Sequence, residues 1–495
     1  ELSFLLSPSA PSLLLRRRVS SSVATSVAPE NPYLGALLPY SPLHVLLLSR
    51  YGDPLVMTSA NLSDEPIGYE KSDALNRMQG IADAALLHDR VIHIFADDSV
   101  VKVVGERARL WRRARGFAPH AVHVPEPFHR PTLAFGPQLK NTFCLGKQDF
   151  ALLSQHIGDM DSDLTAQAQE RALAHFLHIF NAKIELAACD LHPDYTTTRL
   201  AAAWCNERNI PLIRVQHHHA HLASCLAENE TTEHAIGLCL DGTGYGSDGT
   251  IWGGEVLVGD FHSFERAAHL QTVPLLGGER AAYEPWRMAL AWLHETFGEE
   301  VYELPLNFLR ELLSERRKSD LAALLNPELR GKVFPLTSSL GRLFDAVAAI
   351  LFFGTRRQYE GQAAMLLEGR ICAAAEPPYP MDVHKTDGIW ILSPVPMFQA
   401  LVSDIQKGIS ETLLSRRFHE AIVSGFIRLC ELIRESHHLE TVALSGGCFQ
   451  NTFLLSAFEQ RLTQKGFRVL SHHQVPANDA GVSLGQAVVA NAQEK

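Results

Sequence analysis

The spacing of apolar positions along the chain predicts a mixture of helices and strands. In the stretch 418–436, FHEAIVSGFIRLCELIRES, apolar residues recur every three or four positions, which is typical of an amphipathic helix. The stretch 41–52, SPLHVLLLSRYG, predicts another helix that ends at Gly52. The short apolar run TVAL, 441–444, predicts a strand that meets the turn Ser445-Gly446-Gly447. The chain therefore belongs to the mixed α/β class.

Four further stretches combine strand-like runs with turn residues. We expect 53–66, DPLVMTSANLSDEP, to be a strand that runs into a polar loop, and 99–116 to be a hairpin that turns near Gly105. The stretches 132–148 and 235–259 each read as strand, glycine-containing turn and strand. Two such hairpins, each followed by helices, indicate a duplicated α/β fold with a cleft between two lobes.

The proline-rich segment VHVPEPFHRPT, 122–132, is the best candidate for a linker. It would separate a first domain, 1–121, from a longer second domain, 133–495. A chain of 495 residues has room for roughly three lobes at about 150 residues each. The first residue is Glu1 rather than Met, so we expect the sequence to be part of a longer protein.

Composition narrows the possible partners. The net charge of -11, without a basic stripe, argues against a nucleic-acid substrate. No apolar run reaches the length of a membrane helix, and the charges near the start follow the apolar residues, the reverse of a secretory signal. The eight cysteines form no C-x-x-C pair, and we expect buried thiols in a reducing cytoplasm.

The sharpest chemical motif is VQHHHAHLAS, 215–224. His217 and His221 are four residues apart, so on a helix they share one face, while His218 and His219 point elsewhere. Two imidazoles at this spacing can hold one divalent metal ion. The alternative is a histidine cluster on the surface without a ligand.

Two carboxylates could complete such a site. Asp241 follows an apolar strand and opens the glycine-rich turn DGTGYG, where backbone N–H groups can approach phosphate oxygens; a plain β-turn is the alternative. Asp479 precedes the apolar run after PANDAG and could equally cap a helix. A set of two histidines and two aspartates favours iron or zinc over magnesium.

Further turns predict nucleotide contacts. Lys140, Asn141 and Thr142 place a cation and a hydroxyl at a hairpin tip, and Gly277-Gly278 and Gly446-Gly447 permit close backbone approach to a base or ribose. In the first segment, small polar groups and arginines could bind phosphate or carboxylate, with a solvated charged surface as the alternative. Neither a G-x-S-x-G elbow nor a G-x-x-x-x-G-K-[ST] loop occurs in the sequence.

Taken together, these motifs resemble the HypF family of hydrogenase-maturation carbamoyltransferases. The stretches PYSPLHVLLL, MTSANLSDEPI, DDSVVKVV and RRARGFAP resemble the second half of a YrdC-like domain. The stretches QLKNTFCLG, CDLHPDYTTTRLA, VQHHHAHLAS, LDGTGYGSDGTIWGGE, YEGQAAMLLE, LSGGCFQN and PANDAG resemble a Kae1-like domain. The resemblance covers nearly the whole chain in order.

The resemblance implies a partial YrdC-like α/β domain followed by a two-lobed domain of the actin/Hsp70 type. The first would make carbamoyl-adenylate from ATP and carbamoyl phosphate, with Mg²⁺ accompanying the ATP. The second would transfer the carbamoyl group to the C-terminal cysteine thiol of a partner, HypE, which supplies the cyanide ligand of the [NiFe]-hydrogenase iron. The family's acylphosphatase domain and zinc modules have no counterpart in this sequence, and Glu279 stands where the family pattern has Asp.

The resemblance also implies roles for individual residues. The implied metal ligands, three of them also catalytic, are His217, His221, Asp241 and Asp479. The implied nucleotide-binding residues are Lys140, Asn141, Thr142, Gly242, Thr243, Gly244, Glu360, Gly361, Gly446, Gly447 and Asn451, to which the turn Gly277-Gly278 is added from its own sequence. The implied adenylate-forming cleft contains Ser59, Asn61, Ser99, Arg113 and Arg115.

Three other functions fit part of the pattern. One is carbamoyl transfer to a small hydroxyl substrate, and another is threonylcarbamoyl transfer to tRNA, which the acidic balance disfavours. The third is an Hsp70-like module that uses nucleotide to control a binding partner. The histidine pair separates this last class, because a pure ATP switch has no need of it.

Overall fold

The computed structural model describes residues 1–18, 20–62, 65–352 and 359–494. Within them the chain forms two compact units. The first contains residues 1–215, 226–232 and 472–495, and the second contains residues 216–225 and 233–471. No helix in the described part of the chain is long and apolar enough to span a bilayer.

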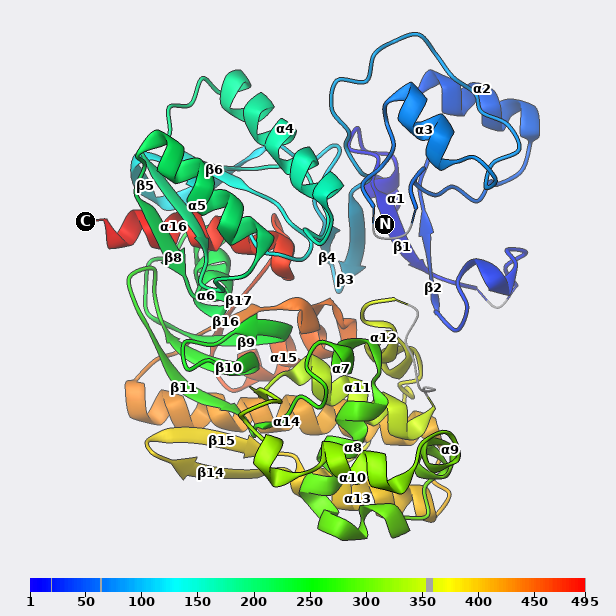
Figure 1. Ribbon diagram of the computed structural model, residues 1–495, viewed down its shortest axis with the longest axis vertical. Helices are drawn as coiled ribbons and strands as arrows, with labels where there is room; N and C mark the ends of the chain where they lie inside the picture. The colour runs from blue at the N-terminus through cyan, green and yellow to red at the C-terminus, as the bar shows by residue number, and fades with distance from the viewer. Residues whose placement is uncertain (19, 63–64, 353–358, 495) are drawn as a thin grey trace. The chain divides into compact units, whose positions relative to one another are not determined.

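The first unit opens with a small four-stranded sheet in the order β2-β1-β3-β4 (Figure 1). Its strands are β1 Ser12–Arg16, β2 Tyr33–Ala36, β3 Val100–Val104 and β4 Arg107–Arg112. The predicted hairpin is confirmed, because β3 and β4 pair antiparallel on either side of Gly105. Leu13, Val101 and Leu110 form the small core of this sheet.

The predicted helix before Gly52 is confirmed as α2, Pro42–Tyr51. Ser41 caps its first turn, and Gly52 ends it in the left-handed conformation. The strand expected within 53–66 is wrong, since 53–62 and 65–66 form no strand, and Ser63 and Asp64 lie outside the described residues. The side chain of Val56 is 73% exposed, so this apolar run does not pack against a sheet. The other helical turns before β3 are α1 Leu2–Leu5, η1 Thr25–Val27 and α3 Lys71–Arg77.

A second four-stranded sheet of the first unit has the order β6-β5-β7-β8. Its strands are β5 Ala121–Ala134, β6 Cys144–Leu153, β7 Leu186–Asp190 and β8 Leu212–Val215. The helical elements of this part are α4 Asp163–Ile179, α5 Thr196–Arg208, η5 Asp479–Gly481 and α16 Val482–Gln493. Leu133, Phe143, Phe176 and Ala187 belong to the buried core of this sheet.

The segment 122–132, interpreted as a linker, is extended and lies within β5. The interpretation as an irregular connection is therefore corrected for its backbone, while the domain boundary itself stays a prediction. The physical reason is the position of the prolines: the pairing of β5 with β6 is irregular between His123 and Phe128 and again between Phe128 and Thr132. Proline lacks an N–H and is tolerated where a ladder is interrupted.

The second unit is built on a nine-stranded sheet. Seven strands follow the order β14-β15-β11-β10-β9-β16-β17, and β12 and β13 pair beside β10. The strands are β9 Ala235–Tyr245, β10 Ile251–Gly259, β11 Phe264–Leu270, β12 Val273–Pro274, β13 Leu336–Thr337, β14 Asp382–Thr386, β15 Ile389–Ser393, β16 Thr441–Ser445 and β17 Arg468–Ser471.

The described helices of the second unit include the predicted 418–436 helix, confirmed as part of α14. They are α7 Arg280–Tyr283, α8 Trp286–Phe297, α9 Asn307–Glu315, α10 Lys318–Leu324, α11 Leu340–Leu351, α12 Gln362–Gly369, α13 Val395–Gln406, α14 Glu411–His437 and α15 Thr452–Gln464. The 3-10 turns are η2 Gly298–Glu303, η3 Pro327–Leu329 and η4 Gly447–Gln450. Helix α6, His217–Glu228, begins in the second unit and ends in the first.

The predicted duplication is visible in the pairing of strands. In the first unit the hairpin β5–β6 is extended by the parallel strands β7 and β8. In the second unit the hairpin β9–β10 is extended in the same way by the parallel strands β16 and β17. Helices connect the parallel strands in both cases, as parallel pairing requires. The predicted mixed α/β fold class is confirmed.

Candidate active site

Helix α6 brings two imidazoles onto one face, as the sequence predicts. The helix begins at His217, directly after Gln216, whose side-chain oxygen accepts a hydrogen bond from the His219 N–H at 2.8 Å. His217 and His221 are each 1% exposed. The ring of His219 turns away and contacts the carbonyl oxygen of Asp260 at 2.7 Å. His218 is buried as well, with its ring centroid 5.3 Å from that of His217.

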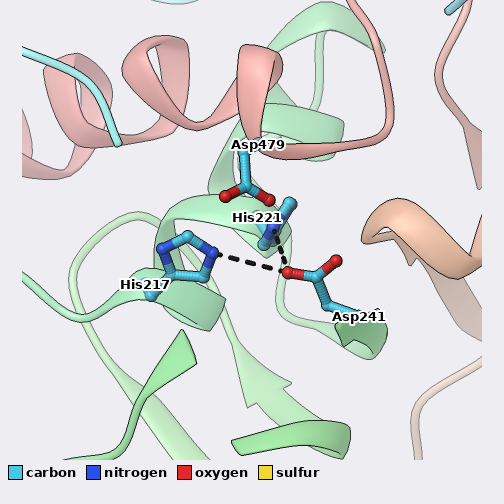
Figure 2. Close-up of side chains that lie close together, drawn as sticks. All are labelled: His217, His221, Asp241 and Asp479. Atoms are coloured by element: carbon cyan, nitrogen blue, oxygen red, sulfur yellow. Dashed lines mark ion pairs between the residues drawn. The ribbon is translucent and has the colours of Figure 1, made fainter. Parts of the chain in front are cut away.

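Strand β9 delivers Asp241 to this face. The Nε2 atoms of His217 and His221 lie 3.6 and 3.5 Å from the same oxygen, Asp241 Oδ2 (Figure 2). These distances exceed the length of an N–H···O bond, about 3.2 Å at most. They approach the roughly 3.3 Å between two ligands that sit about 2.0 Å from a tetrahedral ion. The three side chains therefore fit a divalent metal ion.

The turn after β16 holds two of these ligands in place. The Gly447 N–H donates to Asp241 Oδ1 at 2.9 Å, and Ser445 Oγ lies 3.1 Å from His221 Nδ1. Such contacts fix the orientation of metal ligands. Burial works to raise the pKa of Asp241, but His217 and His221 outweigh it and hold that pKa well below its usual range. The carboxylate is therefore charged near neutral pH.

The sequence predicts a nucleotide contact for Gly447 and no separate role for Ser445. Ser445 is the last residue of β16, the parallel neighbour of β9, and Gly447 begins the turn η4 two residues later. Because the carboxyl ends of parallel strands meet at one edge of a sheet, this turn lies beside Asp241 once β16 pairs with β9, a pairing that no local sequence signal predicts.

Asp479 opens η5 in the other unit, and Figure 2 labels it together with the three residues above. The alternative interpretation, in which Asp479 caps the following helix, does not describe the local structure. Asn478 caps this turn, since its Oδ1 accepts from the Ala480 N–H at 3.1 Å. The assignment of Asp479 as a fourth metal ligand stays a prediction.

The first predicted phosphate loop joins β5 to β6. Asn141 and Thr142 are buried and engaged within the protein: Asn141 Nδ2 donates to Phe135 O, and Thr142 Oγ1 donates to Ala480 O at 2.8 Å. Their side chains therefore shape the loop. Lys140 is only partly buried, and its N–H donates to Asp159 Oδ1 at 2.7 Å.

The second predicted phosphate turn contains Gly242, Thr243 and Gly244, which lie within β9 rather than beyond it. Ser339, which the sequence analysis did not single out, secures this turn. Its hydroxyl donates to the carbonyl oxygen of Gly242 and accepts from the Arg342 N–H at 3.1 Å as the cap of α11.

The remaining nucleotide candidates also occupy turns of the second unit. Gly277 and Gly278 both have positive φ, Glu360 and Gly361 directly precede α12, and Gly446 precedes η4. At Gly446 the backbone requires glycine, because φ is +107° and an added Cβ would lie 2.2 Å from Leu240 O. The backbone conformation accounts for the presence of glycine at position 446, and its contact with a nucleotide stays a prediction.

Asn451 caps α15, and its side chain is oriented by a buried histidine, His419, that was not predicted from the sequence. His419 Nδ1 lies 2.8 Å from Ser415 O, and because a carbonyl only accepts, this nitrogen carries the proton. His419 Nε2 therefore accepts from Asn451 Nδ2 at 2.9 Å, which leaves Asn451 Oδ1 to accept from the Leu454 N–H. No local sequence signal pairs these residues, since they belong to different helices.

Because His419 is buried in this pair, we expect the free energy of unfolding to fall at acid pH. Burial lowers the pKa of His419 from 6.5 to about 4, with Arg416 contributing in the same direction. Since the folded pKa is depressed, stability is complete above the unfolded value and falls as the pH drops from 6.5 towards 4. We expect wild type to lose about 2 kcal/mol between roughly pH 7 and pH 5. His419→Gln, which does not titrate, should lose less. Urea-unfolding midpoints at both pH values check this, and equal losses would contradict it.

The five residues predicted for the adenylate-forming cleft do not form one cluster of mutual contacts in the structure. Ser99 and Arg113 are buried: Ser99 Oγ donates to Arg115 O, and Arg113 donates to the carbonyl oxygens of Leu153 and His120. Burial lowers the pKa of Arg113 to about 10. These two side chains are therefore engaged with backbone carbonyl groups inside the protein.

The other three cleft candidates are more accessible. Arg115 pairs with Asp98 at 2.8 Å and lies over the ring of Tyr40. Asn61 donates to nearby backbone carbonyl oxygens, and Ser59 is exposed. Their role in a cleft stays a prediction.

Fold and site together define a class: a duplicated α/β protein with a buried His/His/Asp centre beside glycine-rich turns. Three sequence families match the chain. Residues 237–486 match the family described as "Carbamoyltransferase, Kae1-like Domain, second subdomain", and residues 127–228 match the "HypF Kae1-like domain". Residues 2–114 match the YrdC-type family described as "Telomere recombination".

Individual proteins agree with these matches. Carbamoyltransferase HypF of Rhodobacter capsulatus is 41% identical over 499 residues, covering 99% of this chain and 64% of that protein. A HypF homologue of Cupriavidus necator is 36% identical over 370 residues, covering 74% of this chain and 92% of that protein. A full-length HypF crystallised in a phosphate- and nucleotide-bound form has a TM-score of 0.93 at 38% identity, covering 99% of this chain and 75% of that one.

The chain belongs to the HypF family of carbamoyltransferases. Its YrdC-like and Kae1-like parts, expected from the sequence, are confirmed by these matches. The chain spans 63% of the HypF of Synechocystis and 64% of that of Rhodobacter capsulatus.

Proposed function

We propose that this chain transfers a carbamoyl group from carbamoyl-adenylate to the C-terminal cysteine thiol of a HypE-like partner during [NiFe]-hydrogenase maturation. The observation that carries the proposal is the convergence of His217 and His221 on Asp241 Oδ2, at 3.6 and 3.5 Å, in a member of a carbamoyltransferase family. Neither a nucleotide switch nor a purely structural domain requires such a buried set of ligands.

The proposed metal ligands are His217, His221, Asp241 and Asp479, and the nitrogen and oxygen donors suit iron or zinc. When bound, this metal would act as a Lewis acid that polarises the oxygens of the acyl phosphate. The chain contributes the orientation of the ligands through Ser445 and Gly447. Mg²⁺ would accompany ATP in the adenylate-forming reaction.

The glycine turns would bind the adenylate. Backbone N–H groups of Gly242 to Gly244 and the Lys140 cation are placed at hairpins, where phosphate oxygens can be approached closely. The turn at Gly446 and Gly447 would face the nucleoside, and Asn451 would contribute by its place at the start of α15. A full-length HypF, similar over nearly all of this chain, has been crystallised with phosphate and nucleotide.

The transfer step conserves atoms and charge. The partner's thiol loses its proton to solvent, and the sulfur attacks the carbonyl carbon of carbamoyl-adenylate. The carbon–sulfur bond forms, the bond from that carbon to the bridging phosphate oxygen breaks, and AMP leaves. AMP is a far better leaving group than hydroxide, so adenylation makes the carbamoyl carbon reactive. The buried position of Asp241 and both histidines limits competing attack by water.

The YrdC-like part would form the adenylate. Water would first hydrolyse carbamoyl phosphate to carbamate and phosphate. A carbamate oxygen would then attack the α-phosphorus of ATP and displace pyrophosphate. Arg115, Ser59 and Asn61 are the more accessible candidates for contacts in this step. The free cysteines of the described chain fit a reducing, cytoplasmic location.

The experiment supplies preformed carbamoyl-adenylate, labelled in the carbamoyl carbon, together with a purified HypE-like partner. We expect label on the partner's C-terminal cysteine and none on a partner that has alanine there. His217→Ala and His221→Ala should slow transfer roughly 1,000-fold, because several kcal/mol of charge stabilisation would be lost. His262→Ala, at an exposed histidine of the same unit, should have no effect. Transfer by the His217→Ala chain at the wild-type rate would refute the proposal.

A further inference from the structure

The last residue of α6, Glu228, is a buried carboxylate that binds a distant loop. It is 2% exposed, and its Oε2 accepts hydrogen bonds from three successive backbone N–H groups. These belong to His473, Gln474 and Val475, at 3.2, 2.7 and 3.3 Å. Successive N–H groups that converge on one oxygen form a site specific for an anion.

Side chains complete the environment of this carboxylate. His472 Nδ1 contacts Glu228 Oε1, and the buried Arg109 donates to the His472 carbonyl oxygen. Burial works to raise the pKa of Glu228, but His472, His473 and the Gln474 N–H outweigh it and lower that pKa. Glu228 is therefore charged near neutral pH, which strengthens each of its hydrogen bonds.

The far end of the same loop is also fixed. Asn478 Nδ2 donates to the Trp111 carbonyl oxygen at 3.2 Å, and Asn478 Oδ1 accepts from the Ala480 N–H at 3.1 Å. Asp479 lies between Asn478 and Ala480 in the chain. The loop 472–478 is thus tied at both ends directly before the predicted fourth metal ligand.

Glu228, the loop 472–478 and Asp479 all belong to the first unit, so these contacts act within one compact body. We propose that Glu228 is a positioning residue for the metal centre, which fixes the backbone that directly precedes Asp479 by binding the loop 472–475. This inference rests on the proposed metal site.

The test measures Zn²⁺ affinity of the full chain by competition with a chromophoric chelator, in a double-mutant cycle. Glu228→Gln preserves the size of the side chain but removes its charge and one acceptor. It should weaken Zn²⁺ binding roughly 10- to 100-fold, the usual effect of losing a group that orients a ligand. In the Asp479→Asn background the same change should have no further effect, because the ligand that Glu228 positions is already lost.

Glu230→Gln is the matched control, since Glu230 is an exposed acid two residues away. It should leave Zn²⁺ affinity unchanged. If Glu228→Gln fails to fold by circular dichroism, Asn478→Ala replaces it in the same cycle, with the same expected pattern. Equal weakening by Glu228→Gln in both backgrounds, or no weakening in wild type, would overturn the positioning role alone. Unchanged affinity in Asp479→Asn would overturn the fourth ligand and this inference with it, whereas unchanged affinity in His217→Ala would overturn the proposed metal centre.

Discussion

Asp241→Asn should slow carbamoyl transfer severely and leave the chain folded. The carboxylate contributes the oxygen on which both imidazoles converge, at 3.5 and 3.6 Å. An amide of the same size keeps the shape and can still accept the Gly447 N–H, but it brings no negative charge to a divalent ion. We expect Zn²⁺ affinity to fall at least about 100-fold and the transfer rate roughly 1,000-fold.

Both quantities are measured on one preparation, by chelator competition and by label transfer from carbamoyl-adenylate. Asp387→Asn is the matched control, because Asp387 is an exposed carboxylate at a turn with positive φ, which asparagine tolerates. It should change neither quantity. An Asp241→Asn chain that keeps transfer within a factor of about three of wild type would show that the carboxylate has no part in the reaction.

Gly244→Ala should damage the same centre from the other side. A Cβ at Gly244 would lie 2.4 Å from His218 Cε1 and 2.7 Å from His217 Cδ2, far inside contact distance. Both rings are buried, so neither can move aside without displacing its neighbours. Overpacking of this kind costs about 1–3 kcal/mol of stability. It should also move His217, and we expect Zn²⁺ affinity to drop roughly 100-fold.

Gly249→Ala separates this effect from simple backbone strain. Gly249 lies in the same hairpin with φ at +77°, and nothing stands within 4 Å of an added Cβ. This variant should lose only about 1 kcal/mol in urea unfolding and keep its Zn²⁺ affinity. If the two variants lose Zn²⁺ affinity to the same degree, contact with the histidines is not the cause.

Local patterns were sufficient to predict the first half of the site. The spacing of His217 and His221 needs only helical periodicity, and Asp241 needs only a strand followed by a glycine turn. The hairpin around Gly105 and the helix before Gly52 were predictable for the same reason. Each of these predictions depends only on residues that are close together in the sequence.

The supporting contacts could not be predicted because they join distant segments. Gly447 orients Asp241, and Glu228 binds Gln474, across more than two hundred positions of sequence in each case. These pairs depend on which strands become neighbours. The expected strand within 53–66 failed for the complementary reason: its apolar residues fit a strand, but no neighbouring strand pairs with them in the described structure.

The proline-rich segment 122–132 shows a different limit. Composition predicted a linker, but a strand can accommodate prolines where its ladder is irregular, and β5 continues through it. The resemblance to the HypF family implied a place in a cleft for the buried arginine Arg113, in line with the phosphate binding of guanidinium groups. Its hydrogen bonds to Leu153 O and His120 O show that the same group can instead satisfy backbone carbonyls.

The most direct test of the central claim is transfer of the carbamoyl group by the chain after removal of its metal. The wild-type chain is treated with chelator, freed of it, and mixed with labelled carbamoyl-adenylate and the HypE-like partner, with and without one equivalent of Fe²⁺ or Zn²⁺. We predict that the stripped chain transfers no measurable label and that one equivalent of metal restores labelling of the C-terminal cysteine. Equal transfer by the stripped and the restored chains would contradict a metal-centred site at His217, His221 and Asp241.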